Sequence, residues 1–207
     1  MFAAYHLIAM RGLRRGEACG LTWDDLDLDE GIAYISQQLQ QESDGQLRAC
    51  PLKTECSRRA VALDPETVIV LRAHRSRQEQ QFIKAGVTPQ GWVFAHEDGE
   101  SLSPSSLTHK FNDLVEGTGL PRVRLHDLRH GAATLMLLAG EDLKTIADLL
   151  GHSSVVLTAD TYLSVAVELG LKSAAAAARL ILNAGKSPPG GGSARRRSGP
   201  VMAEITA

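Results

Sequence analysis

The pattern of hydrophobic and polar positions predicts a chain that is mostly helical. Near the start, in Phe2–Ala18, apolar side chains recur with helical spacing and place Leu7, Met10 and Leu13 on one face. Asp64 is a suitable N-cap for a helix that begins at Pro65, and glycines follow two later helices. The further helices expected are Pro65–Lys84, Ser103–Glu116, His126–Ala139, Asp142–Leu150, Thr158–Leu163 and Leu171–Asn183.

Extended segments occupy one short part of the chain. Ile32–Ser36, Leu47–Lys53 and Arg58–Leu63 have strand character. Gln37–Asp44 between them is polar, and Asp44-Gly45 is a turn signal. We therefore expect an α+β fold, mainly α-helical with a small three-stranded antiparallel sheet.

Composition narrows the class of protein. The 207 residues hold 22 basic and 24 acidic side chains, which gives a formal charge of −2. This balance excludes a protein that binds nucleic acid through uniform positive charge, but it does not exclude one with a local basic cluster. No apolar run reaches the roughly 18 residues that a membrane span requires. The three cysteines, Cys19, Cys50 and Cys56, lack CxxC spacing, which argues against a disulfide framework or zinc site and suits a cytoplasmic protein.

The chain divides into a body and a tail. Residues 1–184 carry the helices and strands, whereas residues 185–207 are rich in Gly, Pro, Ser and Arg. Such a composition buries too little apolar surface to order itself, so we expect a disordered tail.

Several polar residues could carry chemistry. On a helix, His126 and Arg129 lie one turn apart on the same face, where an imidazole and a guanidinium can converge on one phosphate. His152 follows a glycine helix stop and could enter a cleft, and Tyr162 could act as a nucleophile beside cations. Each also has an ordinary interpretation, as a solvated helix edge, a C-cap histidine or a core tyrosine.

Two more cations lie nearer the start of the chain. Arg14 is three residues before Glu17, with which it could simply form an ion pair. Lys53 lies at a predicted turn between strands, where a lysine is either an exposed side chain or a mobile general acid.

Taken in order, these residues fall within recognisable motifs: GLRRGE at 12–17, LKTECSRRAVAL at 52–63, LHDLRH at 125–130, LLGHSS at 149–154 and TADTY at 158–162. With them the chain, from about residue 3 to residue 170, resembles the catalytic domain of the tyrosine recombinases, the phage integrase family. The resemblance implies that this domain cleaves and rejoins DNA strands through a 3′-phosphotyrosine.

The resemblance also implies a role for each residue. Arg14 and Arg129 would grip the non-bridging oxygens of the scissile phosphate, and His152 would donate a hydrogen bond to it. Tyr162 would be the nucleophile, His126 would handle its proton and contact the phosphate, and Lys53 would protonate the leaving 5′-oxygen. Glu17 would help to hold Arg14.

The mechanism implied by the resemblance needs neither metal nor ATP, because cations neutralise the phosphorane and the covalent link conserves the phosphodiester energy. The expected partner is double-stranded DNA, with a tetramer on DNA and a monomer in isolation. Family members usually carry an N-terminal helical domain that clamps the DNA, and no such segment is found in this sequence. A type IB topoisomerase-like enzyme and a non-catalytic DNA-binding remnant are the alternatives.

Overall fold

The computed structural model describes residues 1–42, 44–52, 57–119, 121–152 and 154–156, and then 162, 167, 170–171, 173–176 and 178–180. It divides into two compact units, Met1–Val167 and Glu168–Ala207. In the second unit the described residues between 170 and 180 are helical, which agrees with the alanine-rich helix expected there. The expected tail, residues 185–207, lies outside the described residues, as does most of the expected helix Thr158–Leu163.

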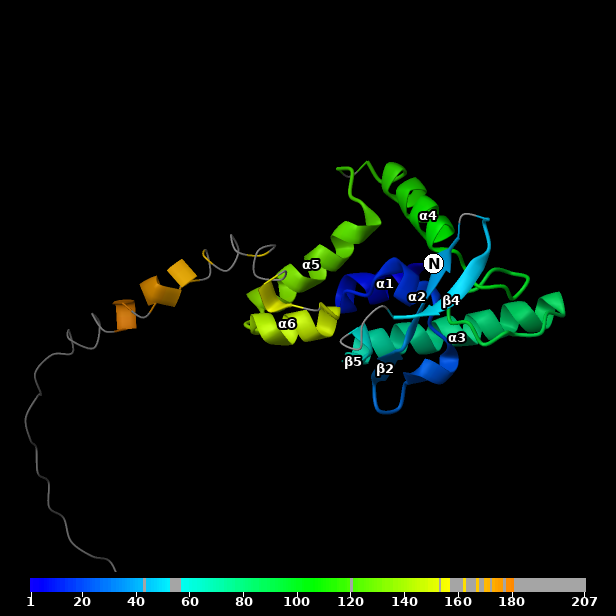
Figure 1. Ribbon diagram of the computed structural model, residues 1–207, viewed down its shortest axis with the longest axis horizontal. Coiled ribbons are helices and arrows are strands. Elements are labelled where there is room, and N and C mark those ends of the chain that lie inside the picture. The colour runs from blue at the N-terminus through cyan, green and yellow to red at the C-terminus, as the bar shows by residue number, and fades with distance from the viewer. Residues whose placement is uncertain are drawn as a thin grey trace, which may run out of the picture. The chain divides into compact units, whose positions relative to one another are not determined.

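The first unit is mainly helical (Figure 1). In the described part of the chain, no helix combines the length and apolar character needed to span a bilayer. The helices are α1 (Phe2–Arg11), α2 (Arg15–Cys19), the 3-10 turn η1 (Trp23–Asp25), α3 (Pro65–Ala85), α4 (Pro104–Glu116), α5 (Leu125–Leu138) and α6 (Leu143–Leu150).

Side-chain caps explain where three of these helices begin. The Asp64 side chain accepts a hydrogen bond from the Thr67 amide at 2.9 Å, and Ser103 accepts one from Ser106 at 3.0 Å. Asp142 accepts from the backbone amides at the start of α6. Because each cap satisfies amides that have no partner within the helix, the expected bounds of α3, α4 and α6 are confirmed to within two residues.

The expected continuous helix over Phe2–Ala18 is wrong. Gly12 adopts a left-handed conformation, with φ 67°, and ends α1, and a second short helix begins at Arg15. Arg14 is left between the two helices in an extended conformation, with φ −70° and ψ 149°. The break therefore releases Arg14 from a helix surface and allows its side chain to turn toward the C-terminal end of α6.

A small antiparallel sheet is confirmed, but its strands differ from those expected. The three-stranded sheet has the order β1-β2-β5, from Leu26–Asp27, Ile32–Ile35 and Arg59–Ala62. Leu47–Pro51 (β4) instead pairs with Gln37–Gln41 (β3) as a separate two-stranded sheet. The glutamine-rich β3 lacks the apolar alternation of a sheet strand, which is why no strand was expected in this polar stretch.

The core gathers around α1, which packs against α2, α3 and α5 (Figure 1). Leu7 and Ile8 of α1 are fully buried, as are Leu13 and Leu21 on either side of α2. Helix α6 packs against α5 and β5. This packing brings the C-terminus of α6 close to the α1–α2 connection, and the polar residues discussed below surround that junction.

Candidate active site

Arg14 and Glu17 form the first element of the site. The backbone amide of Arg14 donates to Glu17 Oε2 at 2.9 Å, and its guanidinium donates to Glu17 Oε1 at 2.7 Å. Glu17 is completely buried, whereas 35% of the Arg14 side chain stays exposed. The local i,i+3 pair thus caps α2 and directs one guanidinium toward solvent.

Glu17 also binds a second arginine from a distant strand. Arg59, on β5, donates from Nη2 to Glu17 Oε2 at 2.8 Å and from Nη1 to Oε1 at 3.2 Å. Burial alone would raise the pKa of Glu17, but Arg59 and Arg14 outweigh it and lower the pKa. The carboxylate is therefore charged, and it links two guanidiniums.

The C-terminus of α6 arranges three arginines. Three consecutive backbone carbonyls each accept a hydrogen bond from a different guanidinium. Leu149 O accepts from Arg59 Nε at 2.6 Å, Leu150 O from Arg129 Nη2 at 2.6 Å, and Gly151 O from Arg14 Nη2 at 3.0 Å. The last carbonyls of a helix lack intrahelical partners and lie at the negative end of the helix dipole, so this end suits cations.

Two glycines permit this close approach. Gly151 ends α6 at φ 64°, and a Cβ there would lie 2.9 Å from Arg59 Nη1. Gly12, also left-handed, provides the carbonyl that accepts a hydrogen bond from Arg129 Nη1, and a Cβ there would lie 2.5 Å from the Leu150 side chain. Both positions combine a backbone conformation that favours glycine with no space for a side chain.

Arg129 is the most deeply placed cation of the group, with 3% of its surface exposed. Burial, followed by the charge of Arg14, lowers the pKa of Arg129 to about 9, so the group keeps its proton at neutral pH. Arg14 and Arg59 bind the Glu17 carboxylate, and Arg129 feels the charge of the same group. The three guanidiniums outnumber this carboxylate, and their excess positive charge can stabilise an anion such as a phosphodiester.

Tyr162 lies on the α5 side of this cluster. Its hydroxyl is 3.1 Å from Nδ1 of His130, and only 4% of the residue is exposed. Burial raises the pKa of Tyr162, whereas the charge of Arg129 acts in the opposite direction. The phenol is therefore protonated at neutral pH and needs a base before it can act as a nucleophile.

Three histidines lie around the arginines. The rings of His126 and His130, one turn apart on α5, meet edge to face with centroids 4.8 Å apart. Burial, followed by Arg129, Arg14 and Arg59, lowers the pKa of His152 to about 4. Partial burial, followed by His130, lowers the pKa of His126. The negative charge of a bound phosphate would offset the positive neighbours that lower the pKa values of His126 and His152. Both rings are therefore suited to donate a hydrogen bond to a phosphate.

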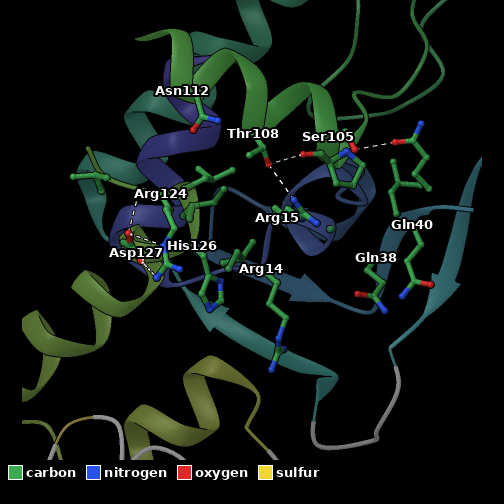
Figure 2. A pocket seen from close by; sticks show the side chains of 18 of the residues that line it. Arg14, Arg15, Gln38, Gln40, Ser105, Thr108, Asn112, Arg124, His126 and Asp127 are labelled. Atoms are coloured by element: carbon green, nitrogen blue, oxygen red, sulfur yellow. Dashed lines mark hydrogen bonds and ion pairs between the residues drawn. The ribbon is translucent and has the colours of Figure 1, made fainter. Parts of the chain in front are cut away.

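A cleft of about 1270 Å³ opens beside the cluster. Figure 2 shows Arg14 and His126 on one side of it and Gln38 and Gln40 of β3 on the other. Helix α4 contributes uncharged polar side chains, and Thr108 among them accepts a hydrogen bond from Arg15 at 3.2 Å. The basic side chains that line the cleft are Arg14, Arg15, Arg122, Arg124 and His126.

The structure brings together most of the residues expected from sequence. Contacts, or charges that shift pKa values, couple five of them: Arg14, Glu17, Arg129, His152 and Tyr162. His126 adjoins this group through the ring of His130. Lys53 lies outside the described residues. Among the described residues, no three His, Cys, Asp or Glu side chains are grouped as metal ligands.

Sequence reasoning missed Arg59 and His130. Arg59 lies two residues before the buried Val61 on a strand, so alternation places this charge on the inward face, which is an unusual position for an unpaired arginine. His130 lies four residues after His126 and so shares its helix face. Both signals were present in the motifs, but only the fold identifies their partners.

The chain is similar in sequence to known proteins. A protein of Caldanaerobacter subterraneus described as tyrosine recombinase XerC-like is 31% identical over 167 residues, which cover 74% of this chain and 43% of that relative. The ICEBs1 integrase of Bacillus subtilis is 30% identical over 168 residues, covering 78% and 44%. The chain therefore spans less than half the length of these curated relatives.

Solved structures show the same fold. XerA recombinase superposes with a TM-score of 0.63 at 25% identity, covering 84% of this chain and 57% of that one. The Tn1549 transposon integrase, in complex with transposon right end DNA, has a TM-score of 0.68 at 24% identity, covering 78% and 53%. Residues 3–168 match the model of the phage integrase family, and the chain belongs to that family.

Proposed function

We propose that this chain is the catalytic part of a site-specific DNA recombinase that cleaves and rejoins strands through a covalent phosphotyrosine. The observation that carries the proposal is the arginine cluster at the end of α6, with a buried tyrosine and three histidines beside it. Family membership and the recombinases and integrases among its relatives support the same activity.

The roles follow the chemistry of each group. Arg14, which is part exposed and lines the cleft, and Arg129, which is buried, would stabilise the charge on the phosphate as it becomes pentacovalent. His152 would donate a hydrogen bond to the phosphate, and the resemblance gives His126 a contact with the phosphate and the handling of the nucleophile's proton. Tyr162 would attack phosphorus, and Lys53 would protonate the leaving 5′-oxygen. Glu17 acts indirectly, by holding Arg14 and Arg59.

Double-stranded DNA is the proposed substrate, and the cleft is its proposed binding surface. Its basic side chains suit phosphates, and its amide and hydroxyl side chains can hydrogen-bond to base edges or to the backbone. A tetramer would form on DNA, as two duplexes exchange strands, whereas the free chain would be a monomer. The place of action would be the cytoplasm, and residues 1–184 would form the catalytic domain with 185–207 as a loose tail.

A trapping experiment on randomised DNA tests the proposal and selects the target sequence at the same time. The protein is incubated with a pool of nicked duplexes of randomised sequence, so that the cleaved fragment diffuses away and an adduct accumulates. Covalent complexes are separated on a denaturing gel and their DNA is sequenced. Wild type should form an adduct on a restricted set of sequences.

The matched variants are Tyr162→Phe, which should form no adduct, and Tyr34→Phe, which removes a half-exposed hydroxyl on β2 and should form as much as wild type. An adduct on Tyr162→Phe would remove this residue as nucleophile. Relaxation of supercoiled plasmid without sequence preference would favour a topoisomerase, and DNA binding without any adduct would favour a non-catalytic protein.

A further inference from the structure

The nucleophile proposed above has one hydrogen-bond partner that the sequence motifs did not assign. The hydroxyl of Tyr162 lies 3.1 Å from Nδ1 of His130, and the two ring centroids are 6.2 Å apart. The distance suits a hydrogen bond, and the phenol is its donor in the tautomer of His130 that carries the ring proton on Nε2 and leaves Nδ1 as the acceptor.

The environment of the pair favours proton transfer between them. Tyr162 is almost fully buried, so bulk water has little access to its hydroxyl. His130 is half-buried, and its ring is held in place against that of His126 on the preceding turn of α5. Arg129, the adjacent residue on α5, places a positive charge near the phenol, which stabilises the phenolate that would form.

We propose that His130 is the general base of the reaction, taking the proton directly from the hydroxyl of Tyr162. The inference rests on the proposed function and adds a catalytic residue to it. His130 then takes the proton-handling role that the family resemblance implies for His126, and His126 and His152 are left to act as donors to the phosphate.

The step balances in protons and bonds. As Oη of Tyr162 attacks phosphorus, its proton passes to Nδ1 of His130, which becomes an imidazolium. The bond from phosphorus to the 5′-oxygen breaks, and that oxygen takes a proton from a general acid, the role proposed for Lys53. In rejoining, the 5′-hydroxyl attacks phosphorus and gives up its proton to the same group, while Tyr162 leaves and recovers its proton from His130.

The contact can be tested without DNA. Tyrosines are labelled with ¹³C at the ζ carbon, which reports hydrogen bonding and ionisation of each phenol, and the Tyr162 signal is assigned from its loss in Tyr162→Phe. His130→Ala should shift that signal, whereas His96→Ala, on the loop between α3 and α4, should leave it unchanged. An unchanged Tyr162 signal in His130→Ala would overturn the contact, whatever the protein does with DNA.

The chemical role is tested on the duplex recovered from the trapping experiment, in single turnover. His130→Asn keeps a polar group near the position of Nδ1 but cannot accept a full proton, so it separates positioning from base catalysis. Both His130→Ala and His130→Asn should slow adduct formation by roughly 100-fold, as expected for loss of a general base. DNA affinity, measured by fluorescence anisotropy, should stay within about twofold, as should both readouts in His96→Ala.

The outcomes separate the two proposals. Cleavage by His130→Asn within twofold of wild type would show that the residue only positions Tyr162 and would overturn the base assignment. If wild type formed no adduct on any duplex, the proposed function would fail, and the base assignment with it. The Tyr162 signal would still decide whether the contact exists.

Discussion

Glu17 and Arg59 form a buried ion pair between residues that lie far apart in the sequence. The Oε2 to Nη2 distance is 2.8 Å, and the exposed fractions of the two side chains are 0% and 7%. Arg59 at the same time donates to Leu149 O of α6. The pair therefore joins α2, β5 and α6, the three elements that hold Arg14 and His152 in place.

Loss of Glu17 should destabilise the protein strongly. Glu17→Ala leaves Arg59 buried without its carboxylate, and breaking a buried pair in this way costs about 3–5 kcal/mol. The measurement is the free energy of unfolding from urea titrations. Asp29→Ala, which removes the exposed partner of Arg72, is the matched control and should cost at most about 1 kcal/mol. Similar losses in the two variants would contradict a structural role for the pair.

Substitution of Gly151 should cost more than substitution of a similar glycine elsewhere. Gly86 ends α3 at φ 66°, and a Cβ there would meet nothing within 4 Å. Gly86→Ala therefore bears only the left-handed backbone cost, about 1–2 kcal/mol. Gly151→Ala has the same backbone cost and also displaces Arg59, for about 1–3 kcal/mol more. Equal destabilisation in urea would show that Arg59 moves away freely.

Stability should fall on mild acidification, partly because of His152. Its pKa in the folded protein is about 4, below the ordinary 6.5, so between these values the unfolded chain binds more protons. The free energy of unfolding must then decrease as the pH falls from about 6.5 to about 4. His152→Asn should show a smaller decrease over this window. The difference between the two proteins at pH 7 measures the loss of the neutral ring's contacts. Curves that run parallel between pH 6.5 and pH 4 would contradict the prediction.

DNA binding should depend on salt through the cleft. Each phosphate neutralised by a cleft cation adds about 0.9 to the slope of log affinity against log salt concentration. Arg122→Ala should therefore lower the magnitude of that slope by about 0.9 on an arbitrary duplex, measured by fluorescence anisotropy. Arg75, which lies over the Trp23 ring and pairs with Glu79 outside the cleft, serves as the control, and Arg75→Ala should leave the slope unchanged. An unchanged slope in Arg122→Ala would place the DNA elsewhere.

Local signals explain why much of the architecture could be predicted. The caps Asp64, Ser103 and Asp142 and the glycine at 151 act within a few residues, so α3, α4 and α6 were found near their true bounds. The errors arose where a local pattern allowed two outcomes. The periodicity of Phe2–Ala18 suits one helix or two, and strand pairing depends on segments that are distant in the sequence.

The sequence by itself determined the fold class, the candidate residues from Arg14 to Tyr162 and their family, because residue types in a fixed order are a property of the chain. Only the tertiary structure decided what each residue contacts. Glu17 serves two arginines, α6 offers one carbonyl to each of three guanidiniums, and His130 meets the hydroxyl of Tyr162. These contacts join segments up to 137 residues apart in the sequence. Which distant segments meet depends on how the helices and strands pack, and no local pattern encodes it.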